Sequence, residues 1–183
     1  ILQARKSSEA LGKNDFTDEE AEKLYRLIGL GALKYFILKV DPKKNMLFNP
    51  NESIDLNGNT APFIQYSYAR IASLLRKAEA MNINYLAKPD STVTISKNEK
   101  ELIKSLNEFP KVIENAGEQL NPAIIANYLF ELAKDFNRFY QETPILKEPE
   151  VEKQKIYLQM SKLTSITLKN GMALLGIEVP EKM

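Results

Sequence analysis

The sequence contains no cysteine and no histidine among its 183 residues. The lack of cysteine excludes disulfides, thiolate metal ligands and cysteine nucleophiles, and it is compatible with a reducing compartment such as the cytoplasm. The lack of histidine excludes Ser-His-Asp triads and imidazole general bases. A zinc site would need carboxylate ligands alone, which is an uncommon arrangement for that metal. These absences leave few routes to catalysis by this chain.

Long hydrophobic runs are also absent. The richest apolar stretch, 33–40, is followed almost at once by Asp41 and Lys43, whereas a membrane-spanning helix needs about 20 apolar residues. We therefore expect no membrane segment. An apolar share of 44% and a charged share of 27% are typical of a folded globular protein, and the length favours one domain with an appendage.

Positive and negative charges nearly cancel. Lys and Arg number 25 and Asp and Glu number 24, which gives a net charge of +1. A broad phosphate-binding surface is therefore not indicated, and any contact with nucleic acid must be local. Unpaired RNA bases can be held by aromatic stacking with few phosphate contacts, so an RNA loop is compatible with this charge. The chain starts at Ile1 without an initiator Met or a secretion signal, and we interpret it as a piece of a longer protein.

The first 58 residues mix helix, strand and turn signals. Thr17 and Glu20 have the spacing of a capping box, and apolar residues at helical spacing follow, so a helix is predicted to begin here. Gly29 and Gly31 indicate a helix end or a kink, and the β-favouring run 35–40 predicts a short strand. Turn signals make 37–58 the least helical segment. We interpret the acidic residues at 18–22 as complementing the helix dipole rather than as a metal cluster.

From residue 60 onward the periodicity is helical. Pro62 fits the first turn of a long amphipathic helix. The apolar stripe of that helix consists of Ile64, Tyr68, Ile71, Leu75 and Ala78. The stretch 82–98 is predicted to be a long loop, because it combines Pro89 with several Ser and Thr residues.

Three further helical patterns follow the loop. Residues 100–116 predict one kinked helix or two short ones, because Pro110 interrupts the pattern, with a stop near Gly117. Asn121 and Pro122 are typical of a helix cap and first position. A last helix beginning near 156 is predicted to close between 171 and 176. The sum is an all-α fold, a bundle of four or more helices behind a small mixed α/β segment.

Three segments, in this order along the chain, resemble arginyl-tRNA synthetase. They are IGLGALKYFIL (28–38) leading to LNGNTAPFIQYSYARIASLLRKA (56–78), NYLFELAKDFNRFYQETPIL (127–146) and LKNGMALLGIEVPEKM (168–183). Together they cover more than half of the chain. The combination is specific, although the family often has a His after the Gln-Tyr pair, where this sequence has Ser67-Tyr68.

The resemblance implies a division of the chain and a function. Residues 1–58 would be the end of a class I catalytic domain, and 59–183 would be a helical domain that binds the anticodon loop of arginine tRNA. The HIGH-type and KMSKS-type motifs and any Gly-rich phosphate loop are missing, so we expect no cofactor here and no aminoacylation by this piece alone. The full-length parent would be an arginine-tRNA ligase that uses ATP and Mg, and it is expected to be cytoplasmic and monomeric. Its remaining catalytic and N-terminal domains are further expected partners.

Matching motif positions imply five residues that bind the anticodon. Tyr66 and Arg70 are four residues apart and share a helix face, so one ring and one guanidinium can meet one base. Tyr140 can offer a stacking platform, and Asn137 a hydrogen-bonding group beside it. Met183 is implied by the motif that ends the sequence.

Structural interpretations of the same residues stay open. Tyr140 can be a core residue, Arg70 a solvated surface residue and Met183 a frayed end. The cations at 76, 77, 88, 97 and 100 can touch phosphates or form a scattered charged face. The alternative function is a helical protein-interaction or scaffold domain without RNA binding. A self-contained enzyme is disfavoured by the missing His and Cys.

Overall fold

The computed structural model describes residues 17–47, 49–89 and 93–183. Within these ranges the chain forms helices and no strand, which confirms the all-α class. The helices are α2 (Asp18–Leu38), α3 (Pro50–Ser53), α4 (Ala61–Ala80), α5 (Lys97–Glu118), α6 (Ala123–Glu142), the 3-10 helix η1 (Ile145–Lys147) and α7 (Val151–Leu174). None of them combines the length and the apolar character needed to cross a membrane.

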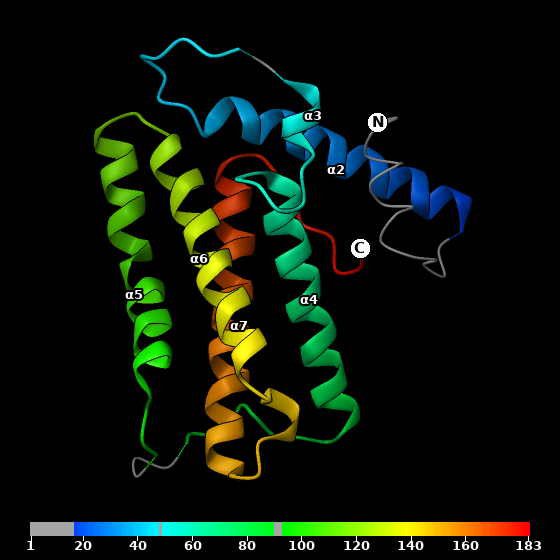
Figure 1. The fold of residues 1–183 in the computed structure, drawn as a ribbon, viewed down its shortest axis with the longest axis vertical. Coiled ribbons are helices and arrows are strands. Elements are labelled where there is room, and N and C mark those ends of the chain that lie inside the picture. The colour runs from blue at the N-terminus through cyan, green and yellow to red at the C-terminus, as the bar shows by residue number, and fades with distance from the viewer. Residues whose placement is uncertain (1–16, 48, 90–92) are drawn as a thin grey trace.

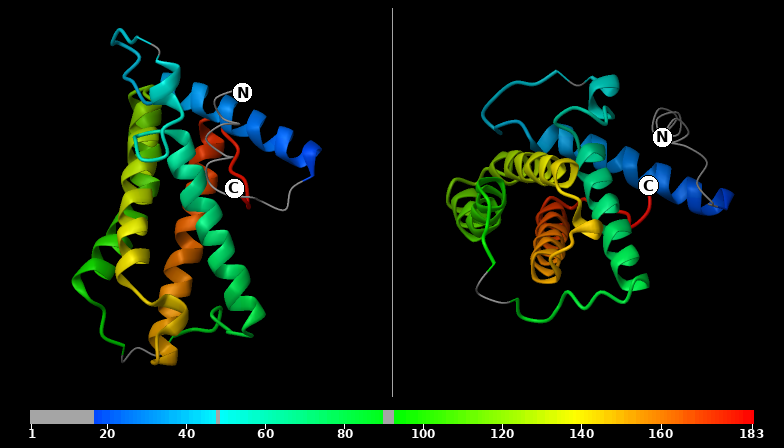
Figure 2. Two further views of the ribbon diagram at one scale, coloured as in Figure 1. Left: turned by 45° about the vertical axis from the view of Figure 1, so that its right-hand side comes forward. Right: turned by 60° about the horizontal axis from the view of Figure 1, so that its bottom comes forward.

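Helices α4 to α7 form a bundle, and α2 crosses one end of it (Figures 1 and 2). Helix α5 packs on α6, α6 on α7, and α4 on α7, α6 and α2. The bundle core contains fully buried Ile64 and Ile71 from α4, Phe136 from α6 and Leu158 from α7. Tyr35 from α2 belongs to the same core cluster, so α2 is continuous with the bundle rather than a separate appendage.

The strand predicted at 35–40 is wrong, because α2 runs without interruption from Asp18 to Leu38. The predicted N-terminus is confirmed: the Thr17 side chain accepts from Glu20 N, and the Glu20 carboxylate accepts from Thr17 N. The hydrogen bonds that the Glu20 carboxylate accepts from the Thr17 backbone N–H and hydroxyl lower the pKa of Glu20. Tyr35 is 0% exposed, with its hydroxyl 2.8 Å from Ala126 O. Burial of this ring on the bundle outweighs the weak β preference of the local sequence.

Two glycines that were predicted to end or kink the first helix lie inside it. Gly31 is buried where α2 meets α4, and a Cβ atom there would lie 2.7 Å from Gln65 Nε2. Gly31 is therefore needed for close approach of two helices. Residues 37–58 are mostly turns and irregular chain, but the prediction that they are the least helical part is wrong: they include the end of α2 and the four-residue α3, whereas the described residues between 82 and 96 contain no helix.

The boundaries of α4, α5 and α6 agree closely with the sequence patterns, whereas α7 begins at Val151, earlier than the predicted start near 156. Pro62 lies in the first turn of α4, which Thr60 caps. The loop predicted at 82–98 ends at Ser96, which forms a capping box with Glu99. Pro110 lies inside the single helix α5, so the alternative of two short helices is wrong. Helix α6 begins at Ala123, one residue later than predicted, with Asn121 Oδ1 accepting from Ala123 N at 3.0 Å.

Gly171 and Gly117 offer a matched test of packing. A Cβ atom at Gly171 would lie 2.5 Å from Leu129 Cδ2, whereas one at Gly117 would meet nothing within 4 Å. We expect Gly171→Ala to destabilise the fold by about 1–3 kcal/mol through overpacking against a fully buried leucine. We expect Gly117→Ala to stabilise it by about 0.4–1 kcal/mol, because alanine restricts the unfolded chain. Urea unfolding of both variants measures the difference, and equal stabilities would contradict the packing described here.

Candidate nucleic-acid interface

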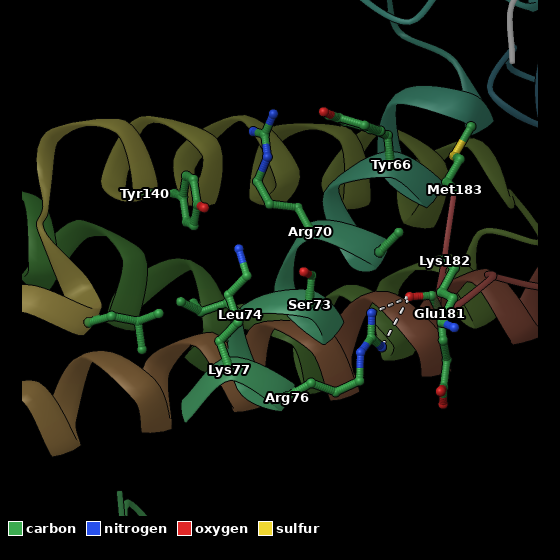
Figure 3. Close-up of a pocket in the computed structure, with 12 residues that line it drawn as sticks. Tyr66, Arg70, Ser73, Leu74, Arg76, Lys77, Tyr140, Glu181, Lys182 and Met183 are labelled. Carbon is green, nitrogen blue, oxygen red and sulfur yellow. Dashed lines mark hydrogen bonds between the residues drawn. The ribbon is translucent and has the colours of Figure 1, made fainter. Parts of the chain in front are cut away.

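A pocket of about 470 Å³ lies between α4, the end of α6 and the segment that follows α7 (Figure 3). Its walls carry aromatic, cationic and small side chains. The lining residues are Tyr66, Ala69, Arg70, Ser73, Leu74, Arg76, Lys77, Tyr140, Leu146, Glu181, Lys182 and Met183. Four of the five residues predicted from the motifs, Tyr66, Arg70, Tyr140 and Met183, thus meet at one place, although they come from three segments of the chain.

The Arg70 guanidinium lies between two aromatic rings. Its Cζ is 4.8 Å from the centre of the Tyr66 ring and 5.3 Å from the centre of the Tyr140 ring. Tyr66 lies one helical turn before Arg70 on α4, and Tyr140 comes from the last turn of α6. Figure 3 shows the three side chains in a row. All three are half-buried, so they are fixed by packing yet accessible to a ligand.

Asn137 fixes the Arg70 guanidinium through a hydrogen bond. Arg70 Nη1 donates to Asn137 Oδ1 at 2.6 Å, and Asn137 Nδ2 donates to Ser67 Oγ at 2.8 Å. The Ser67 hydroxyl in turn donates to the Phe63 carbonyl at 2.8 Å. Asn137 is not among the lining residues, and its Oδ1 and Nδ2 atoms are both engaged within the protein. Its predicted contact with a base edge is therefore untested, whereas its contact with Arg70 is direct.

The segment 175–183 forms one wall of the pocket. Leu175 and Ile177 are buried in the bundle core. Arg76 donates from Nη1 and Nη2 to Glu181 O at 3.3 Å each. Met183 packs against Leu24 and Ile28 of α2, so this part of the chain is anchored at several points. The alternative interpretation of Met183 as a frayed end disagrees with these contacts.

Four cationic side chains and one carboxylate line the pocket, namely Arg70, Arg76, Lys77 and Lys182 with Glu181. This local excess of positive charge contrasts with the near-neutral chain. The cations at 76, 77, 88, 97 and 100 were predicted either to touch phosphates or to form a scattered charged face. Those at 76 and 77 line the pocket, and those at 88, 97 and 100 do not. Ser73 and Lys182 were missed. Positions 66, 70, 73 and 77 share one face of a helix, and that spacing was the available signal for Ser73.

The chemistry of the pocket suits binding more than catalysis. In the part of the chain that the structure describes, no group of three or more acidic side chains is placed to hold a metal ion. Burial raises the pKa of Tyr35, and burial together with a hydrogen bond to Glu99 raises the pKa of Tyr157. Both tyrosines belong to the core rather than to the pocket, so these shifts reflect packing. The pocket offers rings, a planar guanidinium and hydrogen-bond donors, which are groups that recognise unstacked bases.

The part of the chain that forms the pocket matches a known protein family. Residues 64–183 match the DALR anticodon binding domain. The chain belongs to the DALR anticodon-binding domain family. The match lies inside the helical domain predicted at 59–183 and contains every lining residue of the pocket. The assignment of 1–58 to a catalytic domain stays a prediction, and residues 1–16 lie outside the described ranges.

Proteins that are similar in sequence and in structure agree with this family match. An arginine–tRNA ligase of Parabacteroides distasonis is 50% identical over 184 residues, covering 100% of this chain and 31% of the ligase. One of Flavobacterium psychrophilum is 52% identical over 185 residues, covering 98% and 29%. The Thermus thermophilus arginyl-tRNA synthetase structure is 33% identical with a TM-score of 0.85, covering 100% of this chain and 31% of that one. The resemblance to arginyl-tRNA synthetase is thereby confirmed, and the chain spans about a third of the length of these relatives.

The hydrogen-bonded chain behind Arg70 can be tested through Ser67. We expect Ser67→Ala to destabilise the fold by about 1 kcal/mol, because the half-buried Asn137 Nδ2 loses its acceptor. Ser73→Ala is the control, since that half-buried hydroxyl lines the pocket on the same helix, and we expect its stability to change little. Urea unfolding compares the two variants. If Ser73→Ala lowered the free energy of unfolding as much as Ser67→Ala, the hydrogen bonds among Arg70, Asn137 and Ser67 would have no special role in stability.

Proposed function

We propose that this chain binds the anticodon loop of arginine tRNA and reads unpaired nucleotides in the pocket between α4, α6 and the segment 175–183. The observation that carries the proposal is the meeting of two tyrosine rings and a guanidinium plane at one pocket, within a DALR anticodon-binding domain. In this proposal the parent is an arginine-tRNA ligase. Arginine activation with ATP and Mg takes place in other parts of that parent.

Stacking supplies the main binding energy in this proposal. Aromatic rings and the planar faces of arginine both serve as platforms for splayed bases in single-stranded RNA. Tyr66 and Tyr140 lie on either side of Arg70, so each ring is a candidate stacking platform and more than one base can be accommodated. The N–H groups of Arg70 other than the one bound to Asn137 provide donors toward a base edge.

The cations around the rings contact the RNA phosphates in this proposal. Arg76, Lys77 and Lys182 lie at the same pocket, and phosphate contacts position RNA without reading its sequence. Because the net charge of the chain is only +1, attraction of RNA phosphates is expected to depend on this local group rather than on the charge of the whole chain. Base discrimination is therefore assigned to the rings and Arg70, with Asn137 as a positioning residue and Met183 as a wall. A monomeric, cytoplasmic parent remains part of the proposal.

The proposal is tested by titration with RNA hairpins that carry the anticodon stem and loop of arginine tRNA. Fluorescence anisotropy compares the cognate loop with loops in which anticodon bases are replaced one at a time. We expect replacement of a read base to weaken binding by about 1–3 kcal/mol, which is the typical contribution of one stacked base. Equal, weak binding of all loops would reject base reading and favour the helical scaffold alternative.

Tyr140 separates ligand binding from core packing. We expect Tyr140→Ala to weaken binding of the cognate hairpin by about 1–3 kcal/mol, because a stacking platform is lost. Tyr140→Phe is the control, since it retains the ring, and its affinity is expected to stay close to that of the unmodified chain. Circular dichroism and thermal melting accompany the binding measurements. Loss of folding in Tyr140→Ala with normal RNA affinity of the remaining folded fraction would assign this ring to the core.

A further inference from the structure

The segment 175–183 is held as a strap across two helices. It leaves α7 at Gly176, whose φ of +66° turns the chain back. Lys34 Nζ of α2 then donates to Gly176 O at 2.5 Å, and Gln65 Nε2 of α4 donates to Glu178 O at 2.9 Å. Further along, Arg76 contacts Glu181 O. The strap ends at Met183, between α2 and the pocket.

Gln65 is an unusual residue to find at this position. Its side chain is 0% exposed, and its Oε1 is buried without a hydrogen-bond partner among the described residues. An orphaned buried acceptor destabilises a fold, and an apolar residue of similar shape would avoid that cost. What Gln65 provides that an apolar residue cannot is the Nε2 donor to Glu178 O. Its contribution is therefore best explained by where it places the strap.

Helix α2 takes part in this placement. A Cβ atom at Gly31 would lie 2.7 Å from Gln65 Nε2 and 3.2 Å from Ile177 Cγ2, so the bare backbone of α2 packs over both the glutamine and the strap. Met183 rests on Leu24 and Ile28 of the same helix. Helix α2 lies outside the DALR match at 64–183, yet it supports one end of the strap that lines the pocket.

We infer that Gln65 is a positioning residue of the RNA site, which acts through the strap and together with α2 sets the pocket wall formed by Glu181, Lys182 and Met183. The inference rests on the proposed function of the pocket. Gln65 itself is fully buried and is not a lining residue. Its effect on RNA must therefore pass through Glu178 and the residues that follow it. The anticodon site is then a composite of α4, α6, the strap and α2.

The substitution Gln65→Met in the full 183-residue chain tests the inference. Methionine is similar in length, removes the donor to Glu178 O and also removes the orphaned acceptor. We expect the melting temperature to change little and amide hydrogen exchange in the strap to accelerate, above all at Ile177, whose N–H donates to Met172 O at 2.9 Å. We expect affinity for the cognate anticodon hairpin to fall roughly three- to tenfold, because the RNA must now order a loosened strap. Unchanged exchange in the strap would overturn the inference.

Gln159→Met is the matched control. Gln159 Nε2 donates to the carbonyls of Tyr85 and Ala87 at 2.8 Å, so it also fastens an irregular segment to a helix. That segment is not part of the pocket lining. We expect Gln159→Met to leave RNA affinity and strap exchange unchanged. An equal loss of RNA affinity in both variants would assign the Gln65 effect to general loosening and overturn the inference.

A chain that ends at Pro180 distinguishes action through the strap from other routes. It lacks Glu181, Lys182 and Met183, and we expect it to bind RNA more weakly. Adding Gln65→Met to this shortened chain is expected to cause no further loss, because coupled residues are not additive. A full additional loss would show that Gln65 acts elsewhere. Hydrogen exchange is measured without RNA. It therefore reports whether Gln65 orders the strap even if the Tyr140→Ala experiment shows that the pocket does not bind RNA.

Discussion

The close approach of α2 to α4 at Gly31 is the constraint on which the rest of the arrangement depends. Only a glycine leaves space there for the buried Gln65 side chain and for Ile177. The segment after α7 lies against both helices, with Ile177 buried and with hydrogen bonds from Lys34 and Gln65, instead of running free into solvent. The contact thus links a helix near the start of the chain to residues at its end.

A chain of hydrogen bonds that runs from Arg70 through Asn137 to Ser67 is a second constraint on the site. Each member has a partner, and the chain ends on the Phe63 carbonyl. A flexible arginine would lose much rotamer freedom on binding a ligand, but here the protein has already fixed its guanidinium between two rings. A ligand of Arg70 therefore meets a group of donors whose orientation the protein already sets.

Much of the fold could be predicted from periodicity and capping. The capping box at Thr17, Pro62 in a first turn and the helical stripe from Ile64 onward all depend on local chemistry that the sequence displays directly. The predicted strand at 35–40 failed because its outcome depends on a non-local contact, the burial of Tyr35 against α6. Pro110 failed to split α5 for a related reason, since Leu102 and Ala116 on either side are anchored in the bundle.

The candidate site shows the same division between local and non-local information. The shared face of Tyr66 and Arg70 follows from a spacing of four, and Tyr140 and Met183 were supplied by motif resemblance rather than by geometry. The strap contacts had no signal in the sequence, because Gln65 in an otherwise apolar stretch gives no indication of which distant carbonyl it will meet. Asn137 was predicted as a ligand contact, yet its position behind Arg70 depends on the packing of α6 against α4.

The limits of the family match and the limits of the folded unit do not coincide. The DALR match begins at residue 64, but Tyr35 of α2 is fully buried in the same core as α4 and α6. Removing α2 would expose that core, uncover Gln65 and release Met183 from Leu24 and Ile28. A pocket wall made by residues at the end of the chain is therefore supported by residues at its beginning. Any movement of α2 relative to α4 must change the shape of the pocket, because the strap is bonded to both helices.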